Sequence, residues 1–216
     1  ADELIEELKK CPPDLIFVGG SVIVKNNFDF VVSELKNANI APVVLFPGDK
    51  SQISKDADGI LLLSLISGRN PEYLIGQHVL AAPILKQWGK EIIPTSYLLI
   101  DGGNVTSVQK VSRTIPLKQD DVTTIVNTAL AGCQIGHQLV YLEAGSGANI
   151  AVNKSIIEAV KEGVAIPVIV GGGIRSADEA KLAWESGATV VVIGTAFEKG
   201  HLDLIDVLNQ RGKWND

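Results

Sequence analysis

Seven short apolar runs alternate with helical patterns along the 216-residue chain, and this alternation constrains the fold more than any other feature. Most of the runs are apolar throughout, as in parallel strands that are covered on both faces. Strands that alternate with helices predict an α/β protein with a parallel sheet. The expected strands are Leu15–Val18, Pro42–Phe46, Gly59–Ile66, Ile92–Ile100, Leu139–Glu143, Val168–Val170 and Thr189–Ile193.

Helical patterns fill most of the intervals between these strands. Ser176 followed by Glu179 forms a capping-box pattern, so a helix should begin directly after Ser176. The interval 48–58 is too short for a helix and two turns, so the crossover there should be reduced or missing. The expected helices are Ala1–Lys10, Asn27–Asn37, Pro71–Lys90, Asp120–Ile135, Asn153–Glu162, Ser176–Ser186 and His201–Gln210.

A parallel sheet of this length is either open and doubly wound or closed into a barrel. The strand count and an eightfold periodicity favour a modified (β/α)8 TIM barrel with a reduced crossover helix and one strand unaccounted for. The quoted sequence opens on a helix where a barrel should open on a strand. Either the first strand is absent from the quoted sequence because the parent protein begins earlier, which we favour, or the barrel is incomplete. No linker-like or repeated segment interrupts residues 1–216, which predicts a single domain.

Composition and charge exclude several classes of protein. The formal charge of −6 argues against a nucleic-acid partner, which normally needs a clustered basic face. Cys11 and Cys133 are too few and too far apart for a disulfide framework, and the histidines are not at zinc-ligand spacing. No apolar run is long enough for a transmembrane segment, and no signal peptide is present. A reduced, cytoplasmic setting fits best.

Two glycine-rich loops follow the last two expected strands, where barrels commonly bind phosphate. They read "VGGGIRS" over residues 170–176 and "IGTAFE" over residues 193–198. Glycine lets backbone N–H groups approach an anion, and a helix N-terminus adds a favourable dipole. Glycines can also serve tight turns alone, but two such loops in the two expected places favour a phosphate site.

Glu143 stands at the end of an apolar strand, in the string "YLEAGSGA" of residues 141–148. A buried charge is costly unless a partner or a substrate compensates it. No lysine occurs inside an expected strand, which weakens a core ion pair and argues against a Schiff-base aldolase. With a phosphate bound nearby, the carboxylate could accept a proton from a substrate hydroxyl. Tyr141 points to the same side of the strand and is either a substrate ligand or a filler of the barrel interior.

Two other features have two interpretations each. Ser21 in "VGGS" either caps a turn or helps to hold Mg²⁺, and the motif alone favours the cap. The helical stretch 71–90 is apolar nearly all round. It either packs on a neighbouring helix or second subunit, which the pattern favours, or lines a groove for a long apolar substrate.

The strings "YLEAGSGA", "VGGGIRSADEA", "VGGS" and "IGTAFEKG" together resemble the geranylgeranylglyceryl phosphate synthase family, including its heptaprenylglyceryl phosphate synthase-like members. The resemblance covers nearly the whole chain, and "YLEAGSGA" is its most specific string. It implies a prenyltransferase of ether-lipid (phospholipid) biosynthesis. Such enzymes use Mg²⁺ to move a geranylgeranyl or similar long prenyl group from its diphosphate to the C3 hydroxyl of sn-glycerol 1-phosphate, releasing diphosphate. The implied fold is a modified (β/α)8 barrel that has lost its third helix.

The resemblance also implies roles for individual residues. Glu143 would be the catalytic base and Ser21 a magnesium ligand. The family's other magnesium ligand is an aspartate at the end of the first strand, which has no counterpart in the quoted sequence. The helix 71–90 would be a wall of the prenyl groove and a subunit contact in a homodimer or larger homo-oligomer. The implied substrate-binding residues are Tyr141, Leu142, Glu143, Ala144, Gly145, Ser146 and Gly147, with Gly172, Gly173, Gly194 and Thr195 holding the phosphate.

Two alternatives to the synthase remain open. One is another phosphate-binding TIM-barrel enzyme, such as a sugar-phosphate isomerase. Such enzymes commonly need a second acid or base on an opposing strand, and "IIPTSYLLI" supplies none. The other is a non-catalytic barrel that binds a phosphorylated ligand, which the missing first strand keeps open. Magnesium-dependent turnover of a prenyl diphosphate would separate both from the synthase.

Overall fold

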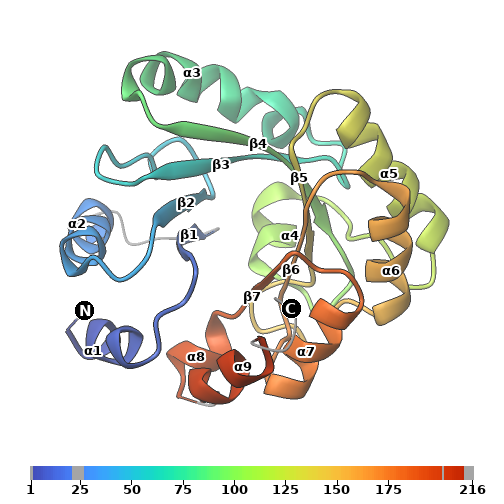
Figure 1. Ribbon diagram of the computed structural model, residues 1–216. Coiled ribbons are helices and arrows are strands. Elements are labelled where there is room, and N and C mark those ends of the chain that lie inside the picture. The colour runs from blue at the N-terminus through green and yellow to red at the C-terminus, as the bar shows by residue number, and fades with distance from the viewer. Residues whose placement is uncertain (1, 21–26, 201, 212–216) are drawn as a thin grey trace. The chain divides into compact units, whose positions relative to one another are not determined.

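The computed structural model describes residues 2–20, 27–200 and 202–211 (Figure 1). Within them, seven strands follow one another across the sheet in chain order. The pairs β1–β2, β2–β3, β4–β5, β5–β6 and β6–β7 are parallel. The strands are β1 (Ile16–Gly20), β2 (Val43–Pro47), β3 (Gly59–Leu65), β4 (Glu91–Leu99), β5 (Leu139–Glu143), β6 (Val168–Gly171) and β7 (Val190–Val192).

This strand order decides between the two architectures that the sequence left open. A doubly wound sheet reverses its strand order at a switch point, whereas the strands of a (β/α)8 barrel follow one another in sequence. The sequential, parallel order is the barrel type, so the predicted α/β barrel class is confirmed. The reduced crossover is confirmed as well, because residues 48–58 connect β2 to β3 without a helix.

The expected helices are all present, with small shifts at their ends. The stretch expected as one helix at 71–90 begins with a π-helical turn, η2 (Glu72–Gly76), which runs into α3. Two short helices were not expected, α4 (Ser107–Ser112) and α8 (Thr195–Glu198). The others are α1 (Asp2–Lys10), α2 (Phe28–Ala38), α3 (Gln77–Trp88), α5 (Val122–Gln134), α6 (Lys154–Gly163), α7 (Ala177–Glu185) and α9 (Leu204–Arg211). None of the helices in the described ranges is long and apolar enough to cross a bilayer.

Contacts group the chain into two compact units, and the prediction of a single domain stays a prediction. The first unit comprises residues 1–63 and 71–94, and the second comprises residues 64–70 and 95–216. In the first unit, the buried side chain of Gln52 fastens the helix-free connection to the end of β1. Its Oε1 accepts from the N–H of Gly48 at 3.0 Å and of Gly20 at 3.3 Å, and its Nε2 donates to the Gly20 carbonyl at 2.8 Å.

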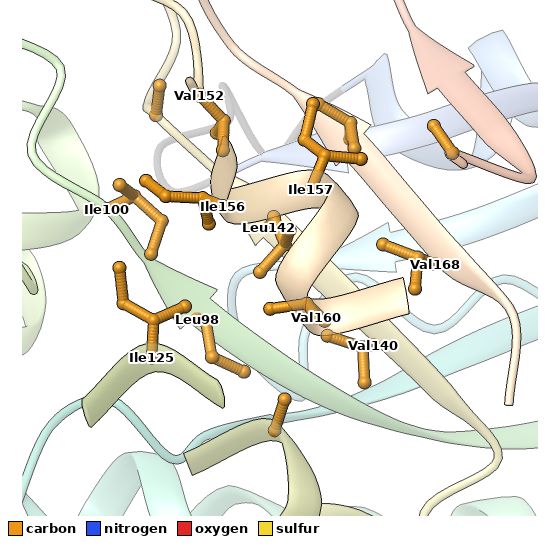
Figure 2. Close-up of a cluster of buried hydrophobic side chains, with 14 of the residues drawn as sticks. Leu98, Ile100, Ile125, Val140, Leu142, Val152, Ile156, Ile157, Val160 and Val168 are labelled. Atoms are coloured by element: carbon orange, nitrogen blue, oxygen red, sulfur yellow. The ribbon is translucent and has the colours of Figure 1, made fainter. Parts of the chain in front are cut away.

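The core of the second unit lies between β4–β6 and the helices α5 and α6 (Figure 2). Leu142 of β5 is fully buried there and packs among apolar side chains of α6. Because side chains alternate along a strand, its neighbours Tyr141 and Glu143 point to the opposite face of the sheet. Figure 2 labels Leu98, Ile100, Ile125, Val140, Leu142, Val152, Ile156, Ile157, Val160 and Val168 of this cluster.

The predicted start of the helix after Ser176 is confirmed by its side-chain contacts. The Ser176 hydroxyl accepts from the N–H of Glu179 at 3.1 Å, as an N-cap residue does. The Glu179 carboxylate accepts in turn from the N–H of Arg175 at 2.5 Å, one residue earlier than in a regular capping box. The glycine loop after β6 therefore runs directly into a capped helix.

Candidate active site

Glu143 is the last residue of β5, and its carboxylate is buried. The residue is 7% exposed and lies opposite Leu99 of β4 and Gly171 of β6 in the strand register. Its Oε1 accepts from the N–H of Gly145 at 2.6 Å. Burial raises the pKa of Glu143, while hydrogen bonds from the Tyr141 hydroxyl and the Gly145 amide act in the opposite direction. Neutral donors therefore hold the carboxylate in a buried environment.

Two buried tyrosines form the wall beside this carboxylate. The rings of Tyr97 and Tyr141 meet edge to face, with centroids 5.5 Å apart. Burial raises the pKa of both hydroxyls well above the usual range, and the negative charge of Glu143 raises them further. Tyr141 therefore stays protonated and donates a hydrogen bond to Glu143. This contact holds the carboxylate in place; a direct contact of Tyr141 with substrate stays a prediction.

Gly172 allows the loop after β6 to approach the end of β5. Its φ of 80° lies in the left-handed region, and an added Cβ would collide with the carboxylate of Glu143 and the amides of Ala144 and Gly145. This explains in physical terms why glycine follows β6 here. The close approach brings one expected phosphate loop against the expected base.

Side chains and main chain tie together the three loops that follow β5, β6 and β7. The guanidinium of Arg175 donates to the carbonyl of Asn149 at 3.2 Å and also to that of Ala148. The hydroxyls of Ser146 and Thr195 lie 2.8 Å apart, within hydrogen-bond distance. The structure thus gathers the predicted residues at one end of the parallel strands, with the exception of the Leu142 side chain in the core. The gathered residues are Tyr141, Glu143, Ala144, Gly145, Ser146, Gly147, Gly172, Gly173, Gly194 and Thr195.

Two residues of this arrangement were not assigned a role from the sequence. Arg175 fastens the loop after β6 to the loop after β5, and its place directly behind the glycines was an available signal. Thr106 is 5% exposed and caps α4 by accepting from the N–H of Gln109 at 3.2 Å. An added Cβ on Gly145 would collide with the Thr106 side chain, so Thr106 supports the loop that carries the Glu143 contact.

The expected magnesium site lies outside the part of the chain that the structure describes and stays untested. Ser21, the expected ligand, lies outside the described residues. Among the described side chains, no group of three or more His, Cys, Asp or Glu could hold a metal ion. Magnesium in enzymes of phosphorylated substrates is often held by one or two carboxylates together with substrate phosphates. Bound Mg²⁺ stays a prediction.

Comparison with known sequences gives extensive matches. The PcrB family model matches residues 1–211. The geranylgeranylglyceryl phosphate synthase of Zunongwangia profunda is 59% identical over 185 residues, which are 86% of this chain and 79% of that protein. The synthase of Thermococcus kodakarensis is 40% identical over 200 residues, which are 92% of this chain and 79% of that protein.

Solved structures agree with the sequence matches. The (S)-3-O-geranylgeranylglyceryl phosphate synthase of Thermoplasma acidophilum, in complex with its substrate sn-glycerol-1-phosphate, is 35% identical with a TM-score of 0.87. That match covers 96% of this chain and 85% of the other. A thiamine phosphate pyrophosphorylase from Pyrococcus furiosus is 13% identical with a TM-score of 0.58, and the match covers 98% of this chain and 89% of the other. This likeness shows the fold alone. By its sequence over nearly its whole length, the chain belongs to the PcrB family.

Proposed function

We propose that this chain transfers a geranylgeranyl or similar long prenyl group from its diphosphate to the C3 hydroxyl of sn-glycerol 1-phosphate. The coarser statement follows from the family and its named relatives: the chain is an enzyme, a prenyltransferase that acts on a glycerol phosphate. The acceptor position, the length of the prenyl group and the need for magnesium belong to the proposal.

The buried carboxylate of Glu143 is the observation that carries the proposed chemistry. In the reaction, the acceptor oxygen forms a bond to C1 of the prenyl group, and the bond from C1 to diphosphate breaks. The acceptor hydroxyl must lose a proton, and Glu143 accepts it. Because burial raises its pKa, this carboxylate is a stronger base than one in water. Proton transfer by such a group contributes about 10²–10⁴-fold to a rate.

The three loops around Glu143 support a site for the phosphate of the acceptor. Gly172 and Gly173 follow β6 with positive φ, and Thr195 meets Ser146 above the end of β5. The related Thermoplasma acidophilum synthase was solved with its substrate sn-glycerol-1-phosphate. A phosphate held by these loops fixes the hydroxyl beside Glu143, and positioning of this kind can lower a barrier by roughly 7–11 kcal/mol.

Magnesium dependence and self-association complete the proposal. When bound, Mg²⁺ would neutralise charge on the departing diphosphate. Removal of divalent cations with EDTA should abolish transfer, with recovery when Mg²⁺ is restored.

Self-association is supported by apolar side chains exposed along η2 and α3, which are Ile75, Val79, Leu80 and Ile84. Light scattering should give the mass of a homodimer or a larger homo-oligomer.

A transfer assay tests the proposal directly. The protein is incubated with Mg²⁺, labelled geranylgeranyl diphosphate and sn-glycerol 1-phosphate, and the product is extracted into organic solvent. The matched control replaces the acceptor by its enantiomer, sn-glycerol 3-phosphate. We expect labelled lipid from the first acceptor only. Equal product from both acceptors, or none from folded protein, would contradict the proposal.

A further inference from the structure

The segment 102–119, between β4 and α5, differs in charge from the rest of the chain. It contains Lys110, Arg113 and Lys118 and no acidic residue, whereas the whole chain has a formal charge of −6. All three basic residues are exposed. Asp101 precedes the segment and Asp120 and Asp121 follow it, so the basic charge is confined to residues 110–118. Such a local excess matters at a charged surface even when the net charge is negative, because salt screens charges beyond about 8 Å at physiological ionic strength.

The same segment exposes large apolar side chains. Val105 is 59% exposed, Val111 is 42% exposed, and Ile115 is 83% exposed. Ile150, on the loop after β5, is 52% exposed and lies over Gly103, where an added Cβ would touch its side chain. Apolar and basic side chains are thus interspersed on two adjoining loops.

Buried hydroxyl groups anchor the inner side of the segment, together with Leu117, which packs against the core of the second unit. Thr106, Ser112 and Thr114 are buried, and the hydroxyls of Ser112 and Thr114 lie 2.7 Å apart. The side chain of Asn70 donates to the Ser112 carbonyl at 2.7 Å. Val105, Val111 and Ile115 therefore lie on the exposed side of a segment whose inner side is fixed. An ordinary surface helix turns its large apolar side chains toward the core instead.

The segment lies next to the candidate active site. It follows the carboxyl end of β4, as Ile150 follows that of β5, and Glu143 stands at the same end of these parallel strands. Thr106 also packs against Gly145, whose N–H is bonded to Glu143. A surface bound by this segment would therefore lie beside the candidate active site.

We propose that residues 102–119, together with Ile150, dock the protein onto an anionic lipid bilayer. The apolar side chains enter the interfacial region, and the basic side chains contact anionic headgroups. The choice of a bilayer over an acidic protein rests on the proposed function, because a prenyl diphosphate and its ether-lipid product both partition into lipid. Docking through residues 102–119 would bring the active site close to the bilayer that contains the prenyl diphosphate and the product.

Vesicle flotation tests the docking without any substrate. Protein is mixed with vesicles of phosphatidylcholine alone or of equimolar phosphatidylcholine and phosphatidylglycerol, at low and high salt. We expect the wild type to float with the anionic vesicles at low salt and much less in the other conditions. Each basic residue should contribute about fivefold to the partition coefficient, so a triple neutral variant should lose about a hundredfold.

Two triple variants separate the charged and the apolar contributions. Lys110→Gln, Arg113→Asn and Lys118→Gln remove the charge; asparagine suits position 113, whose φ of 53° is left-handed. Val105→Ser, Val111→Ser and Ile115→Ser remove the apolar contacts. Matched controls lie elsewhere on the surface: Lys10→Gln, Lys161→Gln and Lys181→Gln for charge, and Ile135→Ser, 71% exposed, for apolarity. Both segment variants should float less than the wild type, and both controls should float like it.

Failure of docking is distinguishable from failure of the proposed function. Wild-type protein that stays off anionic vesicles, or segment variants that float as well as the wild type, would overturn the docking proposal. The proposal would also fail if the segment variants floated like the wild type but differed from it in particle mass by light scattering. The segment would then be a subunit contact. If the apolar triple variant fails to fold, Ile115→Ser alone gives the same test. Transfer measured in detergent on the same samples tests the prenyltransferase separately.

Discussion

Two carboxylates, Asp58 in the first unit and Glu143 in the second, are held in opposite ways. Asp58 accepts from Lys36 Nζ at 2.6 Å and 2.9 Å and from the N–H of Val43 at 2.8 Å. Its burial alone would raise its pKa, but these contacts together leave that pKa below its usual value. Within the described residues, Glu143 receives hydrogen bonds from a tyrosine and a backbone amide and has no cation beside it, and burial leaves its pKa raised.

The difference separates a structural carboxylate from the proposed proton acceptor. The fold stabilises the ionised form of Asp58, so this charge contributes to stability at neutral pH. The fold disfavours the ionised form of Glu143, so at neutral pH its charge costs stability. A costly buried group at the end of a strand, beside glycine loops, is what a proton-accepting site requires.

Glu143→Gln should have the largest effect on activity. Glutamine keeps the size of the side chain and can still accept from Tyr141 and Gly145, but it is a very weak base. We expect the rate of transfer to fall by about 10²–10⁴-fold with the fold retained. Steady-state kinetics with sn-glycerol 1-phosphate measure the rate of transfer. Asp58→Asn is the control, and it should keep the full activity per folded molecule. A near-normal rate in the glutamine variant would remove Glu143 from the mechanism.

Gly172→Ala should disturb the reactive carboxylate by contact. Its new Cβ meets the Glu143 carboxylate and two backbone amides, in addition to the strain of a left-handed φ. Gly136→Ala is the matched control, because Gly136 also has a positive φ but nothing lies near an added Cβ. Strain of this kind costs about 1–2 kcal/mol in both variants. We expect transfer to fall at least about tenfold only in the Gly172 variant, from displacement of the base. Equal loss in both would attribute the effect to backbone strain.

The free energies of unfolding should change with opposite signs in the two carboxamide variants. Asp58 has a lowered pKa, so its contribution is present above the unfolded value of about 3.9 and is lost as pH falls through the folded value. Asp58→Asn should therefore lose about 0.2–1 kcal/mol near neutral pH, the range of exposed ion pairs. Glu143 has a raised pKa, so its stabilising contribution is present below about pH 4.3 and is lost as pH rises through the folded value.

Glu143→Gln should accordingly gain stability relative to the wild type as the pH increases. Urea unfolding of the wild type and both variants at acidic and mildly alkaline pH measures these differences. A glutamine variant that is less stable than the wild type at alkaline pH would show that the Glu143 charge is compensated after all. In that case the contrast with Asp58 would disappear.

Tyr141→Phe should have the smallest effect. The hydroxyl of Tyr141 lowers the pKa of Glu143, so its removal should raise that pKa further. Because the base must be ionised, the acidic limb of the pH profile of kcat/KM should move to higher pH. Tyr97→Phe, which keeps the buried ring next to Tyr141, is the control and should move the limb less. A shift to lower pH in the Tyr141 variant would contradict the hydrogen-bonding scheme.

The sequence predicted those parts of the molecule that depend on local pattern. The strand Leu139–Glu143 is confirmed at both ends, because a continuous apolar run stops at a charge that a glycine-rich loop follows. Ser176 is confirmed as a helix cap, since its hydroxyl needs only a backbone amide three residues on. The helix-free crossover 48–58 follows from its length alone.

Other features depend on contacts between distant segments, which a local pattern does not specify. Helix α4 is too short to show a periodicity, and the support that its cap Thr106 gives to Gly145 appears only in the structure. Arg175 binds carbonyls more than twenty residues away, and no spacing rule encodes such a contact. The roles given to Ser21 and to the glycine loops through the family resemblance stay predictions.

The π-helical turn before α3 sets the direction in which that helix faces. The N–H of Gln77 donates to the carbonyl of Glu72, five residues back, so this turn holds one residue more than an α-helical turn. Successive residues of an α-helix are rotated by about 100°, so deleting one residue here would swing the following side chains by that angle. The exposed side chains of Val79, Leu80 and Ile84 would then point in a different direction although none of them had changed. In this chain a single insertion or deletion between 72 and 76 is thus a means of reorienting a whole surface.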